Sequence, residues 1–180
     1  MRKVTAHLFS SLDGVVENPG EFQGDAFGKE EGELMAAGLA PVTEVLLGRV
    51  IYQEWSEYWP NNPGAGFDAF INPVTKHVAS RTLSGPLEWE NSHLIGGDVL
   101  DFVRELKQGD GGEISVYGIT LIAELLRAGL LDELTLTIHA VLVGAGRRLF
   151  DELDEPLRLE VVKSQVTPQG NAIVTYRRKA

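Results

Sequence analysis

The sequence predicts an α/β protein whose sheet is largely parallel, with an antiparallel edge at its C-terminal end. Two observations predict this class. Strand-like and helix-like segments alternate through roughly the first 130 residues, and after that strand-like segments follow one another. The last two flank "TPQG", which is typical of a hairpin. The chain has 180 residues without a repeat or a linker, so we expect a single domain spanning 1–180.

The first half of the chain contains four expected strands and two expected helices. The strands are 3–10, 44–47, 76–80 and 92–95, and the helices are 25–38 and 49–58. Asp25 stands where a residue would cap the first helix. In the second helix, Ile51 and Trp55 recur at the spacing of one helix face, which favours packing of that face against the core.

The second half begins with a well-marked helix after Asp98. Apolar residues recur at i, i+3, i+4 and i+7 from Val99, and Asp98 is a suitable N-cap. A further helix, 119–128, should end before Gly129, where a C′ glycine would lie. The expected strands are 113–117, 132–144, 157–166 and 171–178.

Composition and charge exclude several classes of protein. The formal net charge is −10, which disfavours nucleic acid and anionic membranes as partners. The chain has no cysteine, and its four histidines lack metal-ligand spacing, so we expect no disulfide and no metal site. It shows neither a membrane-spanning apolar stretch nor a signal-peptide pattern, and we expect a cytoplasmic protein.

Three strand ends carry glycine or arginine at the point where the strand passes into a loop or helix. They are "LLGRV" (46–50), "VASRTL" (78–83) and "VYGITL" (116–121). In sheets of this kind ligands bind at the carboxyl ends of the strands. Glycine exposes the free N–H groups of a first helical turn, which suit a phosphate, and Arg49 and Arg81 add positive charge. The combination favours a dinucleotide site. Taken singly, the first two are also typical of a turn with a solvated arginine, and the third of the start of a helix.

Two further segments are candidates for the same crevice. "SSLDG" (10–14) follows the first strand, so Asp13 either faces the crevice or only shapes an Asp-Gly turn. The long Gly/Pro loop after it could act as a lid. Glu30 or Glu31 of "GKEEGE" could also point into the crevice, although a solvated helix face explains most of that segment.

Several stretches together resemble the dihydrofolate reductase-like superfamily, and more closely the C-terminal reductase domain of the bifunctional riboflavin-biosynthesis deaminase/reductase. They are "SLDG" (11–14), "LLGR" with Tyr52, "YWP" (58–60), "VASRTL" (78–83), "LLRAGLLDELTLTIHAVLVGAGRRLF" (125–150) and "AIVTYR" (172–177). They span nearly the whole chain, and "GLLDEL" followed by "VLVGAGRRLF" is the most specific of them.

The resemblance implies a three-layer fold with a central mixed sheet of about eight strands flanked by helices, and NADPH as the cofactor. It places Leu12, Asp13 and Gly14 near the nicotinamide. It places the phosphates and adenosine at Leu47, Gly48, Arg49, Tyr52, Ser80, Arg81, Thr82, Val116, Gly118, Ile119, Thr120 and Leu121. Preference for NADPH over NADH would then rest on Arg49 and Arg81.

The chain departs from the family pattern at three positions. Ile51 stands where a phosphate-binding threonine is common, and Ile119 where a glycine or serine is common. Relatives of the riboflavin branch are 5-amino-6-(5-phosphoribosylamino)uracil reductases. Trp55 occupies a position where that branch carries an acid, which favours another substrate here.

The resulting hypothesis is an NADPH-dependent reductase that transfers a hydride to a C=N or C=O group of a small heterocycle, pteridine- or pyrimidine-like. Asp13 is the first candidate for the proton relay and Glu30 the second. The alternative is a catalytically inactive nucleotide-binding or scaffold protein, motivated by Ile51 and Ile119. A homodimer whose interface completes the site is a further expectation.

Overall fold

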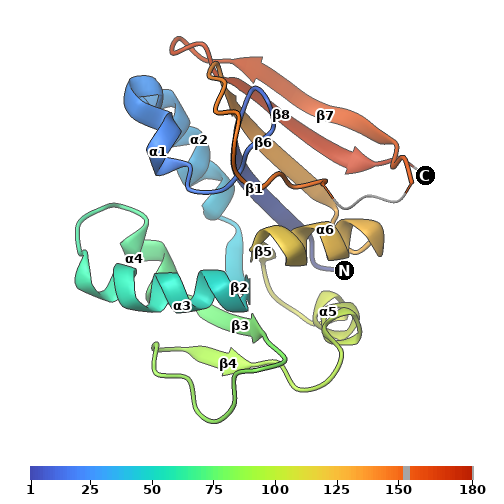
Figure 1. Cartoon of the computed structure of the whole chain (residues 1–180). Coiled ribbons are helices and arrows are strands. Elements are labelled where there is room, and N and C mark those ends of the chain that lie inside the picture. Colours follow the sequence, from blue (N-terminus) through green and yellow to red (C-terminus); the bar gives the residue numbers. More distant parts are fainter. Residues whose placement is uncertain (152–154, 180) are drawn as a thin grey trace.

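The computed structural model describes residues 1–151 and 155–179, and its centre is one eight-stranded sheet (Figure 1). The strand order is β4-β3-β2-β5-β1-β6-β8-β7. The strands are β1 (Val4–Ser11), β2 (Val42–Gly48), β3 (Thr75–Ala79), β4 (Ser92–Leu94), β5 (Glu113–Tyr117), β6 (Glu133–His139), β7 (Leu159–Val166) and β8 (Ala172–Arg178). Neighbouring strands from β4 to β6 are parallel, and β8 pairs antiparallel with both β6 and β7. The predicted mixed sheet with an antiparallel C-terminal edge is confirmed.

The helices lie between the strands as the alternation predicts. They are α1 (Gly20–Gln23), α2 (Lys29–Leu39), α3 (Arg49–Tyr58), α4 (Asp68–Ile71), α5 (Val99–Gln108) and α6 (Ile119–Arg127), with 3-10 turns at Gly24–Ala26 and Trp59–Asn61. The bounds of α3 agree with the prediction. Asp98 caps α5 by accepting from the backbone N–H groups of Leu100 and Asp101.

The prediction was wrong at the start of α2 and at the end of β6. Asp25 lies in a 3-10 turn, and α2 begins after Gly28, whose N–H donates to the carboxylate of Glu31. The β6 strand ends at His139 and not at 144. The segment after it turns back instead and bonds to the loop that follows β1, where Val16 N–H donates to the carbonyl of Arg147.

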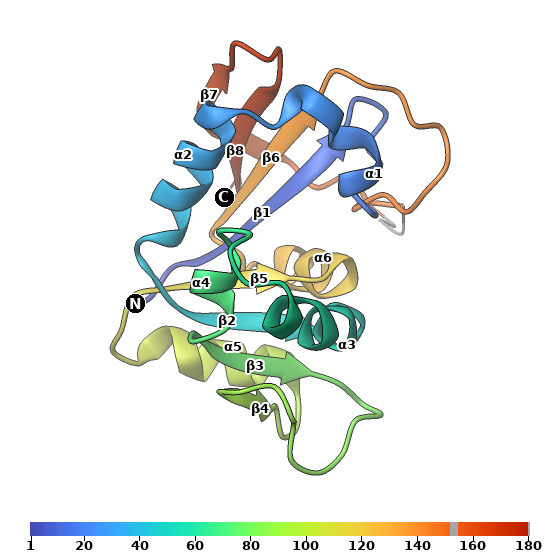
Figure 2. The same cartoon turned by 90° about the vertical axis from the view of Figure 1, so that its left-hand side faces the viewer.

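Helices cover both faces of the sheet (Figure 2). One face carries α5 and α6, whose apolar sides pack on alternate residues of the central strands, such as Val4, Leu134 and Val116. On the other face, α3 and the segments around it pack on β2 and β3 through Val45, Leu47 and Val78, among others. This second core covers only the β2–β3 side.

The central strands alternate in a way that leaves the second face open. In "VTAHLFSS" of β1, Val4, Ala6 and Leu8 contact the α5–α6 core, while Thr5, His7 and Phe9 point to the opposite side. The same alternation in "ELTLTIH" of β6 directs its threonines away from that core. The middle of the sheet therefore has a polar and aromatic surface between α2 and α3.

Across residues 1–151 and 155–179, no helix is long and apolar enough to cross a bilayer. In the same ranges no three His, Asp or Glu side chains gather as they would around a metal ion.

Candidate functional site

The three strand ends singled out in the sequence lie at one edge of the sheet. In the register of the parallel pairs, Gly48 lies opposite Ala79 of β3, and Leu47 lies opposite Tyr117 of β5. Adjacent strands are about 4.8 Å apart, so the corners after β3 and β5 lie directly on either side of the corner after β2. The topology thus brings Arg49, Arg81 and Gly118 to the same carboxyl edge.

Two of these corners touch through glycine. A Cβ on Gly118 would lie 3.2 Å from the backbone N of Gly48 and 3.3 Å from its Cα. Gly118 also has φ of +118°, a backbone conformation that residues other than glycine rarely adopt. The ends of β2 and β5 therefore meet backbone to backbone, and no side chain of their own covers this part of the edge.

The N-terminus of α6 opens onto this bare edge. The helix begins at Ile119 directly after Gly118, so its first N–H groups lack intrahelical acceptors. Arg147, which the sequence reasoning missed, reaches this corner and donates to the hydroxyl of Thr120 at 3.2 Å. Helix N–H groups and a guanidinium side by side are the groups that bind a phosphate.

The two arginines picked from the sequence lie further out. Arg49 is exposed and donates to the side-chain oxygen of Gln53, one turn along α3, at 2.6 Å. Arg81 is exposed in the turn after β3, and that turn is held by Ser80, whose hydroxyl accepts from the N–H groups of Thr82 and Leu83. Both arginines project from the rim of the edge and neither lines the main cleft.

Four of the side chains that the resemblance places at the cofactor face away from the edge. Leu47, Val116 and Leu121 are buried in the two cores. Tyr52 is also buried, with its ring 6.2 Å from that of Trp89, and it borders a separate opening of about 860 Å³ between α3 and the 83–90 loop.

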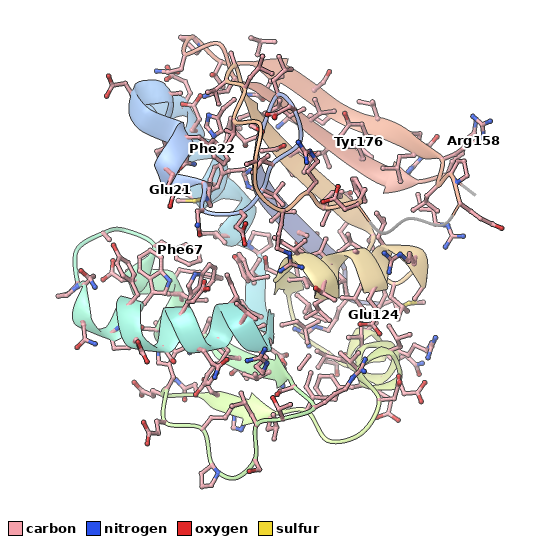
Figure 3. The ribbon with its side chains drawn as sticks, viewed as in Figure 1. Glu21, Phe22, Phe67, Glu124, Arg158 and Tyr176 are labelled. Atoms are coloured by element: carbon pink, nitrogen blue, oxygen red, sulfur yellow. The ribbon has the colours of Figure 1, made fainter. Side chains whose placement is uncertain are left out.

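A cleft of about 1220 Å³ adjoins the edge between α2 and α3. Its walls include Phe27, Leu34 and Met35 on the α2 side and Ile51 and Trp55 on the α3 side. Gly118, Ile119 and Arg147 lie at its end. Figure 3 shows Glu21 and Phe67, which also line the cleft, on opposite sides of it.

The floor of the cleft is the polar surface of the central strands. It includes Thr5, His7, Phe9, Ser115, Tyr117, Thr135 and Thr175. His7 Nε2 lies 2.7 Å from the hydroxyl of Thr137, and burial lowers the pKa of His7 from 6.5 to about 4. His7 is therefore neutral at pH 7.

Asp13 has a full set of partners outside the cleft lining. Its carboxylate accepts from the hydroxyl of Ser11 at 2.7 Å and from the N–H groups of Val143 and Gly144 at 3.0 and 2.7 Å. These hydrogen bonds, that of Ser11 first, lower the pKa of Asp13 below its usual range. Arg148 adds an ion pair at 3.7 Å. Asp13 thus ties the turn after β1 to the segment after β6.

Leu12 and Gly14 belong to the same turn. Leu12 is 65% exposed and its N–H donates to the carbonyl of Val141, while Gly14 N–H donates to the carbonyl of Ser11. Neither lines the cleft; the residues of this loop that do are Val16 and those after it, up to Glu21.

The two glutamates of α2 differ sharply in environment. Glu31 is 2% exposed and accepts from Gly28 N–H and from the side-chain amide of Asn171 at 2.6 Å, which ties α2 to the start of β8. Glu30 is only partly buried and does not line the cleft. The structure therefore brings neither carboxylate into contact with the floor residues.

With this geometry in place, comparison with known proteins identifies the class: the chain belongs to the RibD C-terminal domain family, which it matches over residues 2–173. Family members bind NADP(H). Among particular relatives, it is 28% identical to the Bacillus subtilis (strain 168) "Uncharacterized protein YyaP" over 182 residues, covering 97% of this chain and 94% of the relative.

Two solved structures share the architecture. A riboflavin biosynthesis protein from Shewanella sp. PV-4 is 23% identical with a TM-score of 0.80, and 99% of each chain is covered. Dihydrofolate reductase from Enterococcus faecalis, complexed with NADP(H) and RAB-propyl, is 17% identical with a TM-score of 0.62, covering 99% of this chain and 97% of that chain. The dihydrofolate reductase-like fold expected from the resemblance is confirmed.

Proposed function

We propose that this protein is an NADPH-dependent reductase of a small heterocyclic compound. NADPH would lie across the carboxyl edge of β3, β2 and β5, and the compound to be reduced would occupy the cleft between α2 and α3. The observation that carries the proposal is the contact of Gly48 with Gly118. It leaves a bare backbone edge beside the N-terminus of α6 and Arg147, directly at the end of the cleft.

The residues at the edge match the parts of the cofactor. The α6 N-terminus and Arg147 would hold the pyrophosphate, because both supply N–H donors to one point. Arg81 would meet the 2′-phosphate, since it is exposed at the rim and, in the described parts of the chain, makes no hydrogen bond or ion pair of its own. Its charge is therefore free for an anionic ligand.

Bound NADPH supplies a hydride at C4 of its nicotinamide. The protein's task would be to hold that ring at the cleft end marked by Gly118 and to hold the substrate against it between the apolar walls. Reduction of a C=N group also consumes one proton. Asp13 is a poor source, since its carboxylate is ionised and fully hydrogen-bonded, so we assign the proton to water entering by the cleft mouth.

A titration of NADPH against the purified protein, followed by nicotinamide fluorescence, tests the proposal. We expect saturable binding, with NADPH bound more tightly than NADH. Absence of binding at millimolar NADPH would overturn it.

The inactive nucleotide-binding protein stays as the second candidate because Ile51 and Ile119 lie where the family commonly has smaller or hydroxyl-bearing residues, and both line the cleft. Single-turnover mixing of the NADPH complex with pteridine and pyrimidine compounds separates the two. Loss of absorbance at 340 nm, the band of reduced nicotinamide, favours the reductase. Tight cofactor binding without such a loss favours the second candidate.

A further inference from the structure

His7 combines access to the cleft with a fixed orientation. It projects from the middle of β1 onto the cleft floor, and its ring lies 5.3 Å from that of Phe9 in the same strand. Its Nε2 is held by Thr137, which is 1% exposed and belongs to the neighbouring strand β6. A buried hydroxyl at 2.7 Å therefore fixes which edge of the imidazole faces the cleft.

The second ring nitrogen is left for a ligand. In residues 1–151 and 155–179, Nδ1 of His7 has no hydrogen-bond partner, and it is not among the fully buried polar atoms that lack one. The hydroxyls of Thr135 and Thr175, which also line the floor, pair with each other at 2.9 Å. Nδ1 is thus an open hydrogen-bonding atom on a largely apolar cleft surface.

The pair with Thr137 lets Nδ1 act as donor or acceptor. A neutral imidazole carries one proton, and a threonine hydroxyl can either donate or accept. When the hydroxyl donates to Nε2, Nδ1 carries the proton and donates to the ligand. When Nε2 donates to the hydroxyl, Nδ1 accepts. Reduction of a C=N group turns an acceptor nitrogen into an N–H donor, so one residue can bind both forms.

The charges around the cleft indicate that its ligand carries no phosphate. Five carboxylates line it, those of Glu17, Glu21, Glu54, Glu113 and Glu133, of which Glu133 is paired with Lys3, and the basic groups of the lining are those of Arg147 and Lys163. Arg147 lies at the cofactor end, beside Thr120. The remainder of the lining is acidic in balance, which disfavours a phosphate on the substrate. Aromatic and aliphatic walls on both sides suit the faces of a flat ring.

From these contacts we propose that the cleft binds an uncharged planar nitrogen heterocycle, without a phosphate, whose polar ring edge is received by Nδ1 of His7. This inference rests on the proposed function for the position of NADPH and specifies the substrate class of the same site. His7 is then a substrate-contacting residue, and Thr137 a positioning residue that acts through it.

Calorimetric titrations of the NADPH-loaded protein test the contact, with pterin and 5-aminouridine as uncharged probes. Two substitutions separate the nitrogens. His7→Gln extends an amide toward Thr137 and leaves no group at Nδ1, whereas His7→Asn places its amide near Nδ1. We expect His7→Gln to weaken probe binding about tenfold, and His7→Asn to recover part of that loss. His93→Gln, an exposed histidine outside the cleft lining, is the matched control and should change nothing.

The position of Thr137 is tested by Thr137→Val, which keeps the volume and removes the hydroxyl. This substitution should weaken binding of the probes less than His7→Gln does. His7→Gln should change the Kd for NADPH by less than about twofold, because His7 does not lie at the carboxyl edge of the sheet. Unchanged probe affinity in His7→Gln would overturn the contact, as would failure of both probes to bind the wild-type complex.

Comparing the binding of 5-aminouridine with that of its 5′-monophosphate tests the effect of the cleft's charge. We expect the monophosphate to bind several-fold more weakly, with the difference reduced at high salt. Tighter binding of the monophosphate would overturn the substrate class. Failure of the proposed function differs from failure of this inference, because without that function the wild-type protein would not bind NADPH.

Discussion

The contact between the ends of β2 and β5 makes Gly118→Ala the most informative substitution for stability and cofactor binding together. The new methyl group would lie 3.2 Å from Gly48 N and 3.3 Å from Gly48 Cα, so two backbone segments would have to separate by a few tenths of an ångström. Alanine would also have to adopt φ of +118°. Such backbone strain costs about 1–3 kcal/mol, and overpacking a close contact adds roughly 1–3 kcal/mol.

Two matched glycines separate these contributions. Gly85 has φ of +80° with nothing within 4 Å of its Cβ position, so Gly85→Ala meets backbone strain alone, about 1 kcal/mol. Gly48 has φ of −69°, and its Cβ would lie 3.7 Å from Gly118 Cα, an ordinary contact. Gly48→Ala should therefore change the free energy of unfolding by less than about 1 kcal/mol.

Urea unfolding followed by circular dichroism measures the three costs, and fluorescence titration measures NADPH affinity. We expect Gly118→Ala to lose about 2–6 kcal/mol of stability and to bind NADPH at least about tenfold more weakly. The reasoning is refuted if Gly118→Ala costs no more than Gly85→Ala, or if it loses stability while NADPH affinity is unchanged.

Four other predictions concern single residues. Arg81→Ala should weaken NADPH by roughly 1.5–3 kcal/mol and NADH much less, since it removes one phosphate ion pair; equal loss for both cofactors in parallel titrations would show that another residue meets the extra phosphate. Arg147→Ala should weaken NADPH and NADH equally, about tenfold, because both contain the pyrophosphate; a loss confined to NADPH in the same assay would place Arg147 elsewhere. Asp13→Asn should lower thermal stability but leave the shape of the pH–rate profile unchanged, whereas loss of an acidic limb would restore Asp13 as the proton relay. The folded-state pKa of His7 is about 4, below the ordinary 6.5, so neutral His7 contributes fully to the stability of the fold above pH 6.5 and this contribution is lost as the pH falls toward 4, about 3 kcal/mol in all. Urea unfolding across this pH range should therefore show a smaller loss of stability in His7→Gln than in the wild type. An equal loss in both proteins would contradict the lowered pKa of His7.

The expected homodimer remains a prediction. The edge strand β7 presents Val161 and Val166, which are 58% and 74% exposed, and sedimentation velocity would determine whether two copies associate.

The order of elements could be predicted because each is marked by local signals. The apolar face of α5 with Asp98 before it, and the glycine after α6, define helix ends through contacts only a few residues apart. The three strand ends could also be predicted to lie together, because parallel strands place their carboxyl ends at the same edge of the sheet. The site was visible in the sequence to the extent that it follows from strand direction.

The parts that sequence reasoning missed depend on contacts between distant segments. Arg147 reaches Thr120 only because the chain after β6 pairs with the loop after β1, and no local pattern indicates that pairing. Asp13 is occupied by Val143 and Gly144 for the same reason, 130 residues or more along the chain.

The position of His7 on the cleft floor was not predicted, although the sequence carries a signal for it. "VTAHLF" and "ELTLTIH" alternate between aliphatic residues and polar or aromatic ones, which is the pattern of strands with one face packed and one face open. Because both strands lie in the middle of the sheet, their open faces define a cleft floor. Strand order is set by the whole fold, so the pattern alone could not place them there.

A crystal structure of the NADPH complex tests the central claim most directly. We predict that the pyrophosphate lies at the N-terminus of α6 within hydrogen-bonding distance of Arg147, the 2′-phosphate beside Arg81, and the nicotinamide ring at the Gly118 end of the cleft. Density for the cofactor in the separate opening between α3 and the 83–90 loop, with the β2–β5 edge left bare, would contradict it.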